Sequence, residues 1–163
     1  MPFTPFHWGP TSCIGLSWFQ GFDLPTLLTA TTVIDFEPLL VLVLNLEYPS
    51  HGFFHSFIGC SLLAVVTGIV MYFVRNKVRE IMADFKLQQN SSFKKILWSS
   101  FFGFYFHVLL DSLIYKEMNP FYPREGNPLY TVSPLHMYLF CGFTLLAALF
   151  LYAIRLHLHE DRP

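Results

Sequence analysis

His107 and Asp111 are the first residues whose types and spacing could do chemistry. They stand in the segment FHVLLDSL, inside an otherwise apolar stretch at 96–115. A spacing of four residues places two side chains on one face of a helix. An acid at membrane depth costs about 2.5–3.5 kcal/mol on insertion scales, so such a group usually pairs or has a function. The pair predicts a set of metal ligands or a buried hydrogen bond between helices, and further candidates elsewhere in the chain favour the metal.

His51 and His55 repeat the same spacing in the segment YPSHGFFHSF. Ser50 is a residue type that caps helices, so we expect a helix to begin there with both rings on one face of its first turn. Histidine pairs at helical spacing are common metal ligands. The alternative is a pair of interfacial histidines that binds no metal.

Two acids and two single histidines complete the candidates. Asp35 and Glu37 stand close together in the apolar segment VIDFEPLL, where they must be neutralised or coordinated. Helix capping is the alternative role for both acids. His7, in MPFTPFHWGP, and His136, just after Ser133-Pro134, are each either a ligand or a satisfied polar residue.

These residues together suit a centre of two metal ions. The candidate ligands are five imidazoles and two carboxylates: His7, Asp35, His51, His55, His107, Asp111 and His136. Glu37 is a further ligand or a support to one. This donor set favours zinc, with manganese or iron as alternatives, and it is too large for one four-coordinate ion. Paired metal ions of this kind hydrolyse phosphoesters and amides.

Two basic residues are expected on the same side of the membrane as the candidate ligands. Lys116 and Arg124, in the loop after the second apolar stretch, could hold a substrate phosphate, although solvated loop charges are the alternative reading.

The elements that must position these residues are apolar helices. The chain has 163 residues, of which 53% are hydrophobic and only 13% charged. Residues 56–74, 96–115 and 134–154 are each long and apolar enough for a membrane-spanning helix, which needs about 20 residues. A formal net charge of −1 argues against a nucleic-acid partner. We therefore expect a single all-α domain over residues 1–163, a multi-pass bundle with about three transmembrane helices.

The apolar stretch at 24–46 is interrupted by Asp35, Glu37 and Pro38. It predicts two short helices joined at 35–38, with Pro38 at a first helical position, where its missing N–H costs nothing. Such helices are re-entrant or packed against the spans.

Basic residues indicate the orientation in the membrane. Six of the ten Lys and Arg lie in one short stretch: Arg75, Lys77, Arg79, Lys86, Lys94 and Lys95. The positive-inside rule places the 75–95 loop in the cytoplasm, together with the C-terminus. The candidate metal ligands then lie towards the opposite face.

The order of these motifs resembles a known family. Asp35 in VIDFEP, His51-Gly52 with His55-Ser56, His107-x-x-x-Asp111 and Asn119-Pro-Phe-Tyr-Pro resemble the membrane-bound metal-dependent hydrolases, namely the LexA-regulated, inner-membrane-associated hydrolases and their relatives. That group is distantly similar to the zinc-dependent phospholipase C and P1 nuclease superfamily. The resemblance implies that fold, an inner-membrane location, and ligand roles for His7, Asp35, His55, His107 and Asp111. It also implies that Asp35 bridges metal ions or acts as the catalytic base.

The expected function is a metal-dependent hydrolase that cleaves a phosphoester of a membrane lipid or lipid-linked substrate. Two alternatives stand beside it. One is a transporter of metal ions or protons, because intramembrane His and Asp also build ion paths. The other is a non-catalytic membrane scaffold whose polar cluster holds its helices together.

Overall fold

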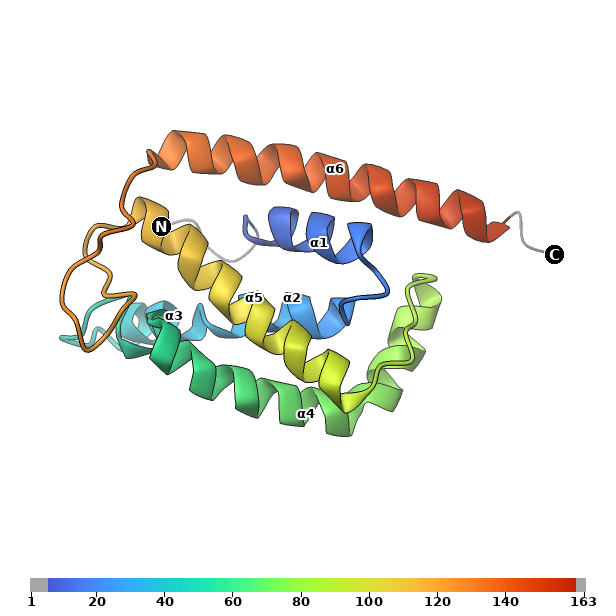
Figure 1. The fold of residues 1–163 in the computed structure, drawn as a ribbon, viewed down its shortest axis with the longest axis horizontal. Helices are drawn as coiled ribbons and strands as arrows, with labels where there is room; N and C mark the ends of the chain where they lie inside the picture. Colours follow the sequence, from blue (N-terminus) through green and yellow to red (C-terminus); the bar gives the residue numbers. More distant parts are fainter. Residues whose placement is uncertain (1–5, 161–163) are drawn as a thin grey trace.

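The computed structural model describes residues 6–160 of the chain. The described residues form α-helices and one short 3-10 helix, with no β-strand among them (Figure 1). Their bounds in chain order are α1 (Trp8–Ser17), α2 (Leu24–Val33), α3 (Phe36–Val43), η1 (Phe53–His55), α4 (Phe57–Asp84), α5 (Phe93–Ile114) and α6 (Pro134–Glu160). The expectation of an all-α chain is confirmed.

Within residues 6–160, four segments, rather than the three expected, are long and apolar enough to cross a membrane: Leu24–Val43, Phe57–Asp84, Phe93–Ile114 and Pro134–Leu158. The additional segment is α2 followed by α3. Neither helix is long enough alone, but together they cover 20 residues, about the length that a bilayer core requires. These properties are compatible with the expected membrane protein.

The helix break expected between Asp35 and Pro38 is present, with a small shift. α2 ends at Val33 and α3 begins at Phe36, so Pro38 is the third residue of α3 rather than its first. Proline is still tolerated there, because the first four N–H groups of a helix have no intrahelical partner. The break leaves Asp35 at the junction of the two helices.

The start of α4 differs from the expectation. Ser56, not Ser50, caps the helix, and its hydroxyl oxygen accepts the Gly59 N–H at 3.0 Å. His51 therefore lies in an irregular loop and His55 ends η1. The two rings do not share a regular helix face, yet the loop brings their centroids to 4.9 Å.

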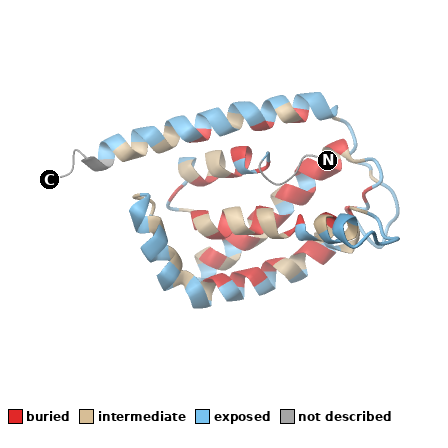
Figure 2. Cartoon of the chain, turned by 180° about the vertical axis from the view of Figure 1, so that it is seen from behind, coloured by how far each residue is buried: buried red, intermediate tan, exposed pale blue. Residues whose placement is uncertain are grey.

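α5 is the central helix of the bundle and packs against α4 and α2. Gly103 allows the approach of α2, because a Cβ there would lie 2.9 Å from the carbonyl oxygen of Leu27. α1 packs against α6 and α2. Figure 2 shows the contrast that results: α5 is largely buried, whereas α6 is mostly exposed along its length.

Several helix ends lie together at one end of the bundle. The beginnings of α4 and α6 lie at the same end of the bundle as α3 and the end of α5, and the loops at 44–56 and 115–133 join them there (Figure 1). The end of α4 and the start of α5, which carry the basic 75–95 stretch, lie at the other end. The segments that carry Asp35, His51, His55, Asp111 and His136 thus meet at one end of the bundle.

Candidate metal centre

Four buried side chains from three parts of the chain converge at this end of the bundle. Asp35, His55, His107 and Asp111 each offer a ligand atom, and these atoms all lie within 4.8 Å of one another. Asp35 comes from the α2–α3 junction, His55 from η1, and the other two from α5. The cluster is thus able to hold a metal ion.

Asp111 lies at the middle of the cluster and is only 2% exposed. The Nε2 atoms of four histidines surround its carboxylate: His107 at 3.2 Å, His51 at 3.8 Å and His55 at 3.9 Å from Oδ2, and His7 at 3.2 Å from Oδ1. Two further histidines, His7 and His51, therefore extend the four-residue core. The i, i+4 contact between His107 and Asp111 has the geometry that their spacing predicted.

The outer nitrogens of two rings are tied to groups that can only accept hydrogen bonds. His55 Nδ1 lies 2.7 Å from Glu37 Oε2, and His107 Nδ1 lies 3.0 Å from the carbonyl oxygen of Thr31. A carbonyl or an ionised carboxylate requires the ring to donate from Nδ1. A neutral ring then carries its lone pair on Nε2, which in both residues is the atom that faces Asp111. Metal-bound histidines are oriented in this way.

Two inner atoms of the cluster form no hydrogen bond within the protein. Beside them, His107 Nε2 lies 3.2 Å from Asp111 Oδ2 and 3.4 Å from Asp35 Oδ1, so one ring nitrogen faces two carboxylates. His55 Nε2 and Asp111 Oδ1 are fully buried without a hydrogen bond. An unsatisfied buried polar atom costs about 1–3 kcal/mol. A divalent cation between these nitrogen and oxygen atoms satisfies them together, and the residues present therefore fit a metal.

Neither acid of the VIDFEP segment acts as a helix cap. Asp35 precedes α3, but its side chain accepts no hydrogen bond from the first turn of that helix. Glu37 accepts the Phe54 N–H at 3.2 Å on one oxygen and the ring of His55 on the other. The capping alternative is therefore wrong for both acids, and Glu37 takes the supporting position beside a candidate ligand.

His51 joins the edge of the cluster through its aromatic neighbours. Its ring stacks on Tyr115 with 4.1 Å between centroids. Burial lowers the pKa of His51 to about 4, although the negative charge of Asp111 acts in the opposite direction. The ring is therefore neutral at pH 7 and can offer a lone pair.

Three residues expected at the site lie apart from the cluster. His136 is exposed, and its Nδ1 pairs with the Ser133 hydroxyl at 2.5 Å at the start of α6. It stays outside because α6 packs mainly against α1, and the start of α6 turns Met137 and Cys141, rather than His136, towards Leu110 and Ile114 of α5. Lys116 and Arg124 are exposed loop residues. No described contact joins their side chains to the four-residue core, so the phosphate-binding role expected for them has no support in the structure.

Two residues that sequence reasoning missed support the cluster. The carbonyl of Thr31 orients His107, and a backbone group carries no residue-type signal. Tyr115 stands four residues after Asp111, and that helical spacing could have suggested its place beside the site.

A cavity of about 370 Å³ with a mixed polar and apolar lining has His51 in its wall. Tyr48, Asn119 and Tyr122 are among its other lining residues. Because His51 also lies 3.8 Å from Asp111, it connects this cavity to the cluster. A small group that fills the cavity would lie beside His51.

No family model, curated protein or solved structure matches this chain. The resemblance to the membrane-bound metal-dependent hydrolases therefore stays a prediction.

Proposed function

We propose that this chain is a membrane-embedded hydrolase that uses one or two divalent metal ions, zinc being favoured, to cleave a phosphoester of a lipid or lipid-linked substrate. One observation carries the proposal: His55 and His107 both donate from Nδ1 to an outer acceptor and both direct Nε2 at Asp111. This arrangement suits metal binding better than helix packing, because a packing role would leave His55 Nε2 and Asp111 Oδ1 buried without a hydrogen bond.

The residues around the cluster support hydrolysis. A divalent cation supplies Lewis-acid polarisation of a phosphoryl oxygen and a water of lowered pKa. Asp35 lies against His107 and is not used as a cap, so its carboxylate is placed to ligate or to accept a proton from water. Six candidate donors surround one small volume: Asp35, His7, His51, His55, His107 and Asp111. That number is enough for a second ion.

The position of the cluster supports a lipid substrate over an ion path. It lies near the end of α5 and just before the start of α4, two membrane-length helices whose ends lie where lipid headgroups are found. An ion path needs polar groups that continue across the bilayer. Here Ala30, Ala64 and Phe104, all fully buried, pack together in the core between the helices that carry the ligands. The buried hydroxyls of Ser99 and Ser100 in α5 are bonded to backbone carbonyls.

The proposal is tested by metal analysis and phosphate release on the purified protein. We expect bound zinc in the wild type, and loss of metal and of phosphoesterase activity in His107→Ala and Asp111→Ala. His136→Ala is the matched control, because this histidine lies outside the cluster. Unchanged metal content in the two cluster variants would contradict the proposal. Bound metal without cleavage across a panel of lipid phosphoesters would favour transport.

A further inference from the structure

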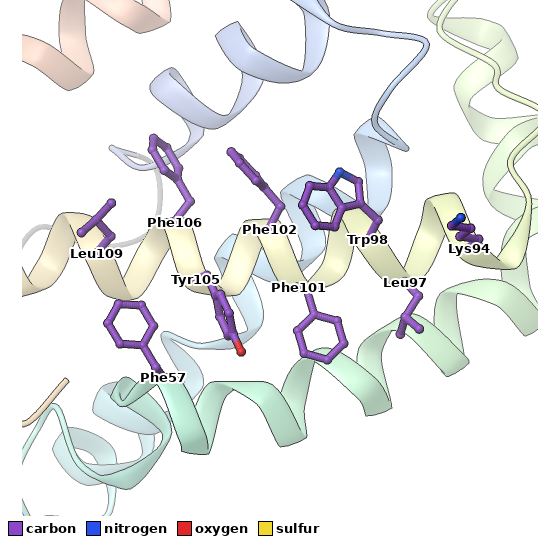
Figure 3. A pocket seen from close by; sticks show the side chains of 9 residues that line it. All are labelled: Phe57, Lys94, Leu97, Trp98, Phe101, Phe102, Tyr105, Phe106 and Leu109. Carbon is purple, nitrogen blue, oxygen red and sulfur yellow. The ribbon is translucent and has the colours of Figure 1, made fainter. Parts of the chain in front are cut away.

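Two apolar cavities open on the surface of the bundle, and they differ in their relation to the cluster. The larger, about 540 Å³, lies along one face of α5 and is closed at one end by Phe57 of α4 (Figure 3). The smaller, about 400 Å³, lies between α3, the loop after it and α4. We call them the α5 groove and the α3 cavity.

The α5 groove faces away from the candidate ligands. Its lining residues Trp98, Phe102 and Leu109 project from α5 as Figure 3 shows. Leu109 stands two positions from both His107 and Asp111, which places it about 200° around the helix from each. No candidate ligand lines this groove. It is a lipid-facing surface without access to the cluster.

The α3 cavity, in contrast, reaches Glu37, the residue that bonds to the candidate ligand His55. Glu37 lines it, and both oxygens of this carboxylate are already bonded, one to the Phe54 N–H and one to His55. The rest of the lining is apolar and includes Leu40, Val41 and Leu63. The cavity therefore suits a hydrocarbon chain whose polar end lies near His55.

Tyr48 stands between this cavity and the cavity at His51, because it lines both. Its hydroxyl accepts the Phe53 N–H at 2.8 Å. Its ring lies directly on Gly52, where any Cβ would overlap it. Tyr48 thus separates the apolar α3 cavity from the His51 cavity, whose lining also includes the polar side chains of His51 and Asn119.

We propose that the α3 cavity binds a hydrocarbon chain of the substrate while the His51 cavity receives its phosphoester headgroup, with Tyr48 at the boundary between them. This inference rests on the proposed function and names the substrate as an amphiphile recognised by its chain as well as its phosphate. The two cavities have similar volumes and share one wall, and each touches a residue in contact with the cluster, Glu37 or His51. An amphiphile that fills both cavities places its headgroup beside His51, whose ring contacts Asp111.

The experiment maps where a chain binds. The probe is dodecylphosphonate with a photoreactive diazirine near the end of its chain, applied to the zinc-loaded full-length protein in detergent. Its C–P bond resists hydrolysis. Mass spectrometry is expected to find the label on peptides of α3 and the loop after it, and unlabelled dodecylphosphonate should displace it. The matching diazirine without a headgroup is the control for non-specific contact with apolar surfaces.

Two matched variants test whether the chain binds in the α3 cavity or in the α5 groove. Leu40 and Leu109 are both exposed and line the α3 cavity and the α5 groove respectively. Leu40→Trp should weaken saturable labelling about tenfold, the loss expected when about two methylenes leave an apolar site. Leu109→Trp should leave labelling of α3 unchanged. The inference would be overturned by labelling in the α5 groove or by equal labelling of α3 with the control probe. It would also be overturned if Leu40→Trp were labelled as strongly as the wild type.

Metal binding, cleavage and labelling together distinguish a failure of the proposed function from a failure of the chain site. If the protein binds no metal and cleaves nothing while the phosphonate still labels α3 saturably, the hydrolase fails and the chain site stands. If phosphoesters are cleaved but the label lies on α5, the hydrolase stands and the chain site is wrong.

Discussion

The carboxylate of Glu37 lies 2.7 Å from the Nδ1 of His55, on a ring that is fully buried. The two residues are 18 positions apart, one in the first turn of α3 and the other at the end of η1. The contact joins the short α3 to the loop before α4. It also determines which nitrogen of His55 faces the cluster, so the geometry of the metal centre depends on the position of α3.

Glu37→Gln is expected to lower metal affinity by about 10- to 100-fold, the usual cost of losing the partner of a metal-binding histidine. The amide removes the negative charge that favours donation from Nδ1. Competition with a chromophoric chelator measures the affinity. Glu47→Gln, at an exposed loop position, is the control and should bind as the wild type does. Equal affinities in the two variants would mean that Glu37 does not support the site.

Zinc should stabilise the folded protein, because a ligand that binds only the native state shifts unfolding by mass action. The gain is about 2.7 kcal/mol at a free concentration of about 100 times the Kd. Thermal unfolding in detergent, with and without a chelator, measures it. Asp111→Asn should lose the response to zinc, since this carboxylate lies among four histidines. A full response in this variant would contradict the central place of Asp111.

Gly103→Ala is expected to destabilise the protein by about 1–3 kcal/mol through overpacking. The new Cβ would lie 2.7 Å from Ala30 Cβ and 2.9 Å from the Leu27 carbonyl oxygen, so α2 must move away from α5. The movement also displaces the Thr31 carbonyl from His107, and metal affinity should fall. Denaturant unfolding and zinc titration measure the two effects.

Gly142→Ala is the control for that substitution, because a Cβ on this glycine of α6 meets nothing within 4 Å. Alanine is favoured over glycine in a helix by about 0.5–1 kcal/mol. This variant should therefore be as stable as the wild type or slightly more stable. Equal losses in both variants would show that the approach of α2 to α5 does not matter.

The orientation in the membrane predicts opposite labelling of two exposed loop positions. In a background without native cysteines, an impermeant maleimide should label Glu125→Cys in intact cells and Gln88→Cys only after permeabilisation. The reason is that Gln88 follows the basic residues of the 75–95 stretch, which the positive-inside rule retains in the cytoplasm. The reverse pattern would invert the orientation and place the metal centre on the cytoplasmic side.

The amino-acid sequence by itself determined the local features of this protein. Apolar composition over long stretches predicted the helices, and the acids and proline of VIDFEPLL predicted the break between α2 and α3. The spacing of His107 and Asp111 predicted their contact, because residues four apart on one helix are neighbours whatever surrounds them. These features depend only on residues close together in the chain.

Only the tertiary structure decided which distant residues meet. His7 joins Asp111 whereas His136 stays on the exposed start of α6, although residue type alone made both histidines ligand candidates. The beginning of α4 at Ser56 left His51 in a loop, and packing of the loop rather than helix spacing brought it to His55. Thr31 acts through a carbonyl that only the close packing of α2 on α5 delivers to His107. Such contacts depend on helix packing and loop paths, which residue types and spacing do not encode locally.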